Sequence, residues 1–113
     1  MVTLTASCHC GAVVLSAEFP QGLASAARCD CSFCRRRGAA AVTALTSTLK
    51  VQKGGKNLSL YTWGTGTAKH YGCKTCGIYT HPQRRSAPTQ SGVNLGCITG
   101  GNPRHHSETY GEI

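Results

Sequence analysis

Short apolar and β-branched runs, separated by clusters of Gly, Pro and Ser, form the main pattern along this chain. Runs of this length bounded by turn residues are typical of β-strands. No segment of comparable length shows the 3.6-residue period of an amphipathic helix. The pattern predicts an all-β domain of antiparallel hairpins, with strands at residues 2–7, 12–17, 40–45, 49–52, 58–63 and 93–98.

The residues between these runs predict the turns. Within residues 58–63 the apolar side chains mostly alternate with small polar ones, which predicts a strand with one solvated face. Residues 54–57 predict a hairpin turn, and residues 64–66 and 82–92 predict loops. At most one short helical turn is expected, at residues 33–37, with Ser32 as its N-cap and Gly38 as its stop.

A length of 113 residues predicts a single domain over residues 1–113, with a core at about 5–100 and a polar tail at 101–113. The core is short of large side chains, because the chain has only two Phe, one Trp and four Tyr, and its apolar fraction includes eight Cys. We therefore expect metal ions or disulfides to supplement the core.

The N-terminal segment decides how the cysteines are interpreted. Residues 1–12 contain neither a basic region nor an apolar run of signal-peptide length, and nowhere do ~20 apolar residues follow one another. These features predict a soluble, cytoplasmic protein with no membrane partner. In a reducing compartment, thiolate–metal sites are expected instead of disulfides, and half-cystines in a Cys-x-Cys sequence would also be strained.

Seven of the eight cysteines fall into three clusters whose spacing suits zinc. Tetrahedral zinc needs sulfurs close together, at about 2.3 Å from the metal. Two of the clusters end in Cys-Gly, and a glycine there lets the backbone turn around the ion. We predict that these two clusters form one structural four-thiolate site, made by Cys8, Cys10, Cys73 and Cys76.

The third cluster, Cys29, Cys31 and Cys34, has three thiolates and no obvious fourth ligand. A zinc with three protein ligands keeps one position open for water or substrate, as in catalytic sites. Open zinc can hold a thiol as thiolate or polarise a carbonyl oxygen, which suits chemistry between a thiol and an aldehyde. The alternative is a second structural site, closed by a backbone group or by a side chain of His9, Asp30 or Cys97.

Arginines follow the three-cysteine cluster directly. Arg35, Arg36 and Arg37 would stand near an open zinc and bind the carboxylates of a substrate, and Arg84 and Arg85 could join them. The alternative is a solvated basic face.

Net charge gives a second interpretation of the chain. Twelve Lys and Arg against four acids give +8, and two zinc ions on seven thiolates would reduce this to +5. A basic zinc-binding module for nucleic acid or a protein partner is therefore the main alternative to an enzyme. The sequence shows no clustered aromatic residues of the kind that stack single-stranded bases.

The remaining cysteine and the histidines are assigned less active roles. Cys97 is expected to be a buried inert thiol, with a nucleophilic or redox role as the alternative. His70 and His81 are predicted either to lie next to the metal ligands of the Cys73-x-x-Cys76 knuckle and orient them, or to lie on a strand surface. His105 and His106 are expected to be solvated in the tail.

These motifs resemble the glutathione-dependent formaldehyde-activating enzyme (GFA) family over about residues 5–100. The resemblance is carried by Cys8-His9-Cys10-Gly11, Cys29-Asp30-Cys31-Ser32-Phe33-Cys34-Arg35, Cys73-x-x-Cys76-Gly77 and Gly92-Val93-Asn94-Leu95-Gly96-Cys97. It implies an Mss4-like β-tent fold with small antiparallel sheets around zinc. It also implies two Zn²⁺ per chain, a structural ion at the two Cys-Gly motifs and a catalytic ion at the central motif.

The activity implied by the resemblance is the condensation of glutathione with formaldehyde to S-(hydroxymethyl)glutathione, a carbon–sulfur lyase reaction. The expected ligands are therefore a glutathione-like thiol and a small aldehyde. Proteins that share this fold include centromere protein V, a binding protein, and B-type methionine sulfoxide reductases, which would give Cys97 a redox role. Fold alone does not decide between these functions.

Overall fold

The computed structural model describes residues 1–29, 31–84, 88–102 and 109–110. Within them the chain forms strands, one α-helix and three short 3-10 turns. The strands are β1 (Val2–Ser7), β2 (Val14–Phe19), β3 (Ala27–Arg28), β4 (Ala41–Leu45), β5 (Lys50–Lys53), β6 (Leu58–Tyr61), β7 (Lys69–Cys73), β8 (Tyr79–Gln83), β9 (Gln90–Asn94) and β10 (Thr109–Tyr110). The helix is α1 (Ser32–Arg37), and the 3-10 turns are Thr46–Thr48, Gly55–Asn57 and Leu95–Cys97.

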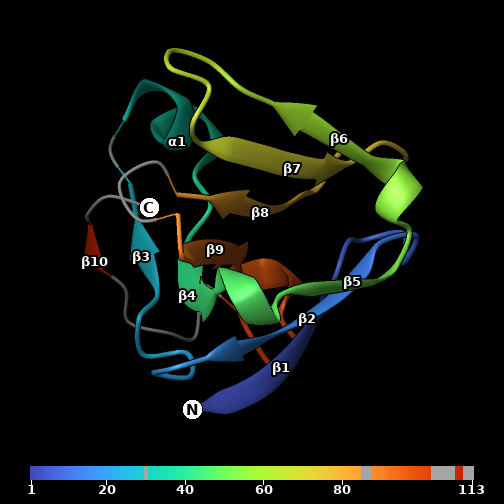
Figure 1. Cartoon of the computed structure of the whole chain (residues 1–113), viewed down its shortest axis with the longest axis vertical. Helices are drawn as coiled ribbons and strands as arrows, with labels where there is room; N and C mark the ends of the chain where they lie inside the picture. The colour runs from blue at the N-terminus through green and yellow to red at the C-terminus, as the bar shows by residue number, and fades with distance from the viewer. Residues whose placement is uncertain (30, 85–87, 103–108, 111–113) are drawn as a thin grey trace.

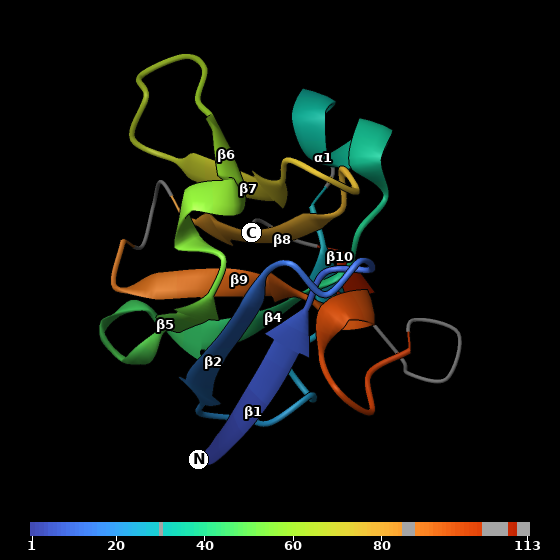
Figure 2. The same cartoon turned by 90° about the vertical axis from the view of Figure 1, so that its right-hand side faces the viewer.

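The strands form two sheets. The smaller has the order β1-β2-β5, and the larger has the order β10-β3-β4-β9-β8-β7-β6. Every pairing in both sheets is antiparallel except that of β10 with β3, in which Thr109 lies opposite Ala27. Figures 1 and 2 show the smaller sheet against the β4–β9 part of the larger one, with α1 beside β7 and β8 at the other end of the molecule.

The main core lies between the smaller sheet and strands β4 and β9. Side chains of β2 alternate between partly exposed and buried, which directs Leu15 and Phe19 inward. They meet Val42 of β4 and Val93 of β9, and all four are at most 1% exposed. Full burial of such a side chain contributes about 1.5–3 kcal/mol, so this small set holds the two sheets together.

The all-β prediction is confirmed, with a single short helix. The strand predicted at residues 93–98 is only partly correct, because β9 ends at Asn94 and a 3-10 turn follows. The side chain of Asn94 accepts a hydrogen bond from the Gly96 backbone N–H at 3.2 Å. This local bond favours a turn over continued strand pairing.

The hairpin predicted at residues 54–57 is wrong. Strand β5 pairs with β2 and β6 pairs with β7, so this turn joins the two sheets and does not close a hairpin. The loop predicted at 82–92 is also shorter, because β8 extends to Gln83 and β9 begins at Gln90.

Strand β6 lies at the edge of its sheet. Its neighbouring residues Leu60 and Tyr61 point to opposite faces of the sheet, and both are more than half exposed. Both faces of this strand are therefore solvated, and the prediction of a single solvated face is wrong.

The helix ends where expected but begins one residue earlier, because its N-cap is Cys31 and not Ser32. Cys31 has an extended backbone, and its sulfur accepts a hydrogen bond from the Cys34 N–H at 3.3 Å. Gly38 ends the helix in the left-handed conformation, as expected. None of the helices in the described residues is long and apolar enough to cross a bilayer.

Candidate metal centres

The first candidate centre joins two turns that lie far apart in the sequence. Cys8 and Cys10 lie in the turn between β1 and β2, and Cys73 and Cys76 lie at the turn between β7 and β8. Their four sulfur atoms all lie within 4.8 Å of one another. The structure thus brings together the two pairs that share a Cys-Gly ending.

The spacing of these sulfurs fits a zinc ion and excludes a disulfide. The Sγ atoms of Cys8 and Cys10 are 3.6 Å apart, and those of Cys10 and Cys73 are 3.7 Å apart. Four sulfurs at 2.3 Å from one tetrahedral ion would be about 3.8 Å apart, whereas a disulfide needs about 2.05 Å. This group of thiols can therefore hold one zinc.

The backbone around this centre is shaped to present sulfur atoms. Gly11 and Gly77, which follow the last cysteine of each pair, have φ angles of 79° and 75°. Only glycine adopts such angles without strain, so each chain can turn tightly behind the sulfurs. Backbone N–H groups of Val13 and Thr75 donate to the sulfurs of Cys8 and Cys73 at 3.3 and 3.4 Å.

Backbone hydrogen bonds lower the pKa of Cys73 and Cys76 and so favour thiolate, the form that binds metal. Hydrogen bonds from the backbone of Cys10 and Ile78 lower the pKa of Cys76 to about 6. The side-chain amide of Asn57 also donates to Cys73 Sγ at 3.3 Å. A backbone N–H acts to lower the pKa of Cys10, but burial and the neighbouring thiols outweigh it and raise this pKa to about 11. The peptide groups thus prepare Cys73 and Cys76 in particular for a cation.

The second candidate centre is built around the start of α1. Cys29 follows β3, Cys31 caps the helix and Cys34 lies in its first turn. The three sulfurs lie within 4.8 Å of one another. Cys34 is 5% exposed, whereas Cys29 and Cys31 are partly exposed, so solvent reaches one side of the group.

The three thiols differ in acidity. Burial raises the pKa of Cys34 to about 12. Burial also acts to raise the pKa of Cys31, but the Cys34 backbone N–H and the adjacent thiols outweigh it, and the net shift is downward. A buried anion needs a cationic partner, so all three sulfurs become thiolates together only when a cation joins them.

A set of buried polar groups without partners lies next to this centre. Arg37 donates from Nη2 to Cys34 Sγ at 3.5 Å, and its guanidinium carbon lies 3.5 Å from the centre of the Tyr79 ring. Its Nε and Nη1, the Tyr79 hydroxyl and both ring nitrogens of His70 are buried and find no partner among the described residues. Buried polar groups normally find a partner, so this arrangement is suited to receiving a polar ligand.

Aromatic rings cover the same side of α1. Phe33, between Cys31 and Cys34, stacks on Tyr61 at 5.3 Å and lies 6.5 Å from Trp63, measured between ring centroids. Tyr61 is 53% exposed and Trp63 is 43% exposed. The expectation that no aromatic cluster exists is therefore wrong, because two segments far apart in the sequence meet here.

The other predicted residues are placed as follows. Arg35 and Arg36 are exposed on α1, and Arg36 donates back to the Ser32 carbonyl. Arg84 bonds to Thr43 and Gln90 and to no cysteine. Neither His9 nor Cys97 belongs to the three-sulfur group. The predictions for Asp30, Arg85, His105 and His106 fall outside the described residues.

Cys97 is buried, as expected, and its sulfur faces the Tyr79 carbonyl at 3.5 Å. Burial raises its pKa to about 11. A thiol with such a pKa is a poor nucleophile at neutral pH. The placement favours the inert interpretation of Cys97.

The two strand histidines are buried, which corrects the surface alternative. His81 Nδ1 lies 2.9 Å from Thr80 Oγ1, and its ring stacks on Tyr71 at 4.7 Å. His70 packs against Phe33 at 4.5 Å and so lies beside the second centre, not behind the first. Sequence spacing did not reveal this, because it depends on where α1 docks.

Buried His81 predicts a pH-dependent stability. Burial lowers the pKa of His81 to about 4, so the folded protein keeps this side chain neutral while the unfolded chain binds a proton below pH ~6.5. Its contribution is fully present above that pH and is lost as pH falls toward 4. From pH 7.5 to 5.5 it accounts for about 1 kcal/mol of unfolding free energy.

Urea denaturation of the zinc-saturated protein at a series of pH values measures this loss. We expect His81→Gln to show a shallower decline than the wild type over this interval. Equal declines in the two proteins would assign the effect to other groups.

The comparisons with known proteins agree with this geometry. A family model described as glutathione-dependent formaldehyde-activating enzyme matches residues 3–111. The chain belongs to this family. Its GFA-type fold is also similar to the crystal structure of a Rhodobacter sphaeroides protein solved by structural genomics, with 55% identity and a TM-score of 0.91. The match covers 95% of this GFA chain and 99% of that one.

Proposed function

We propose that this chain is a zinc-dependent enzyme that adds a glutathione-like thiol to formaldehyde or a related small aldehyde. The observation that carries the proposal is the three-sulfur group of Cys29, Cys31 and Cys34. No fourth His, Cys, Asp or Glu belongs to it among the described residues, and it lies beside buried polar groups without partners. The four-sulfur group would hold a second, structural zinc.

Zinc with an open position supplies stabilisation of a thiolate or polarisation of a carbonyl oxygen at neutral pH. In the reaction, a sulfur–carbon bond forms and the carbonyl becomes a hydroxyl group, and the thiol proton balances the new O–H. No electron carrier is needed.

The polar groups around Cys34 would orient the reactants. Tyr79, whose pKa burial raises, keeps its proton and would donate a hydrogen bond to the aldehyde oxygen. Burial, and next the charge of Arg37, lowers the pKa of His70 to about 4, so its neutral ring would accept a hydrogen bond. These roles use atoms that otherwise lack partners in the described part of the chain.

Recognition of the thiol would depend on arginine. Glutathione has two carboxylates, and the Nε and Nη1 of Arg37 find no acceptor among the described residues beside the cysteine group. Arg35 and Arg36 on the exposed side of α1 add positive charge near it. Guanidinium groups suit carboxylates because they donate two parallel hydrogen bonds.

Exchange NMR with ¹³C-formaldehyde and glutathione tests the proposal, since the two also combine spontaneously and an enzyme would accelerate their exchange. We expect the zinc-loaded protein to raise the exchange rate by at least about 100-fold over the same mixture without protein. Cysteamine, a thiol without carboxylates, should show a smaller acceleration. The proposal fails if the protein leaves the glutathione exchange rate unchanged.

A second candidate function is favoured by the aromatic cluster. Exposed Tyr61 and Trp63, next to the basic face of α1, resemble the stacking surfaces that bind single-stranded nucleic acid. Trp63 is the single tryptophan of the chain, so its fluorescence reports on this surface. A salt-sensitive response to an oligonucleotide, without a response to glutathione, would favour this function.

A further inference from the structure

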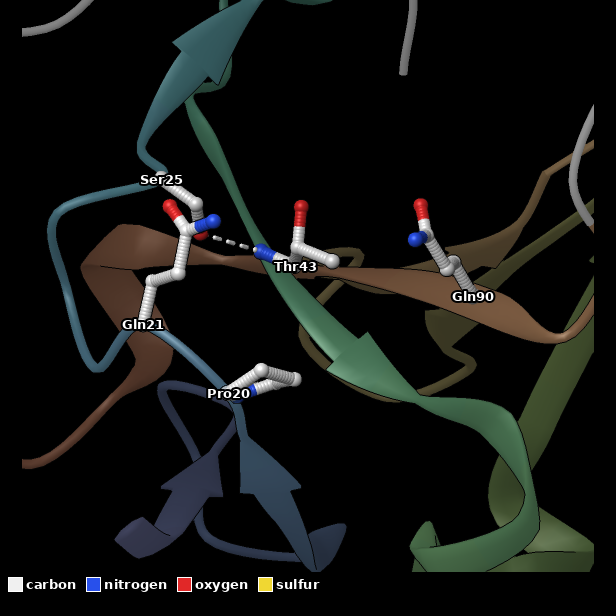
Figure 3. A pocket seen from close by; sticks show the side chains of 5 residues that line it. All are labelled: Pro20, Gln21, Ser25, Thr43 and Gln90. Carbon is white, nitrogen blue, oxygen red and sulfur yellow. Dashed lines mark hydrogen bonds between the residues drawn. The ribbon is translucent and has the colours of Figure 1, made fainter. Parts of the chain in front are cut away.

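A polar cavity lies away from the cysteines, between the segment that follows β2 and strands β4 and β9. It has a volume of about 330 Å³ and is lined by Pro20, Gln21, Ser25, Thr43 and Gln90. Figure 3 shows the amide groups of Gln21 and Gln90 on either side of Thr43. A cavity of this size accommodates a small metabolite.

Arg84 connects two of the lining side chains. Its Nη1 donates to Gln90 Oε1 at 2.9 Å, and its Nη2 donates to Thr43 Oγ1 at 2.8 Å. Arginine only donates hydrogen bonds, so the atom of Gln90 that faces it must be the oxygen. The Gln90 amide nitrogen is therefore turned away from Arg84 and can donate elsewhere.

The same reasoning fixes the hydroxyl groups. Because Thr43 Oγ1 accepts from Arg84, its own hydrogen is free to donate. Ser25 Oγ accepts from the Thr43 backbone N–H at 2.9 Å, which leaves its hydrogen free as well. The Gln90 amide nitrogen and the hydroxyl hydrogens of Thr43 and Ser25 can therefore all donate hydrogen bonds around one cavity.

The charge nearby has no counter-ion in the described residues. Arg84 is partly buried, and its Nε is buried without a partner among the described residues. Glu18 is the only acidic side chain in the described part of the chain, and no contact places it at Arg84. Burying a cation without an anion is costly.

From this donor set and this charge, we infer that the cavity is a binding site for a small oxyanion, a phosphate or an organic carboxylate. Gln90, Thr43 and Ser25 donate to its oxygens, and Arg84 supplies the compensating charge from behind them. The inference does not depend on the proposed function, because none of these residues belongs to either cysteine group.

NMR titration of the zinc-loaded, ¹⁵N-labelled full chain tests the inference, with phosphate, acetate and chloride in separate arms at equal ionic strength. We expect saturable shifts of the Gln21 and Gln90 side-chain amides and the Thr43 backbone amide, with a Kd on the order of 1 mM. Saturation by phosphate or by acetate identifies the source of the oxyanion. Shifts that rise linearly with all three salts overturn the inference.

Gln90→Glu is the decisive variant. The new carboxylate keeps the bond to Arg84, neutralises its charge and presents an acceptor to the cavity, so affinity should fall at least about tenfold. Gln52→Glu makes the same charge change on the exposed strand β5 and should alter affinity less than about twofold.

Thr43→Val, which removes one donor and keeps the volume, should weaken binding as well. If Gln90→Glu and Gln52→Glu bind the oxyanion with equal affinity, the binding follows the overall positive charge of the protein and the proposed site is overturned.

Discussion

Replacing Cys73 with serine should leave a chain that does not fold cooperatively. Cys73 is 2% exposed, packs with Cys8 and Val13, and its sulfur accepts hydrogen bonds from Thr75 and Asn57. Structural zinc contributes about 10–16 kcal/mol in small zinc domains, comparable to the ~5–15 kcal/mol that stabilises an entire fold. Thermal melting by circular dichroism, together with zinc content per chain, measures the effect.

Cys97→Ala provides the matched control, since it removes a buried cysteine outside both groups. It should retain two zinc ions per chain and lose only about 1–2 kcal/mol of stability. A Cys73→Ser protein that melts cooperatively with its full zinc content would contradict the structural role of the first centre.

Replacing Cys31 with serine should abolish aldehyde-dependent activity while the fold persists. The main core contains none of Cys29, Cys31 or Cys34, so loss of the second ion leaves the packing of the two sheets intact. Zinc content should fall from two ions to one, and the exchange rate should return to that of the same mixture without protein, a loss of at least about 100-fold. Metal analysis and the exchange assay on the same sample measure both.

Ser32→Ala is the neighbouring control, because Ser32 is exposed and Arg36 donates to its backbone carbonyl, which alanine keeps. It should keep both zinc ions and full activity. If Cys31→Ser keeps its activity with one zinc per chain, the reaction does not take place at this centre.

Local features of the chain were predictable from sequence, because they depend on neighbouring residues. The strand at residues 2–7 follows from a short apolar and β-branched run, and the end of the helix follows from the glycine that caps it, Gly38. The close spacing of the cysteines indicated zinc, and the Cys-Gly ending shared by two clusters paired Cys8 and Cys10 with Cys73 and Cys76. Tetrahedral zinc restricts sulfur positions strongly enough to substitute for knowledge of the fold.

Features that depend on tertiary contacts were missed. Strands β7 and β8 contain His, Gly and Pro, which weaken a strand signal, and they form because β6 and β9 pair with their outer edges. The approach of His70 and Tyr79 to α1 depends on the helix docking against these strands. Residue spacing in the sequence does not predict these contacts, so the polar groups around the second centre could be identified only from the structure.

The four-sulfur centre also constrains how the protein is made. Cys10 and Cys73 are 63 positions apart, so the first pair of thiols leaves the ribosome well before its partners exist. The first two thiols therefore cannot complete this centre until the second knuckle has been synthesised. Zinc can therefore be bound by all four cysteines only after most of the chain has been translated, so this part of the fold cannot form in the order in which its residues are synthesised.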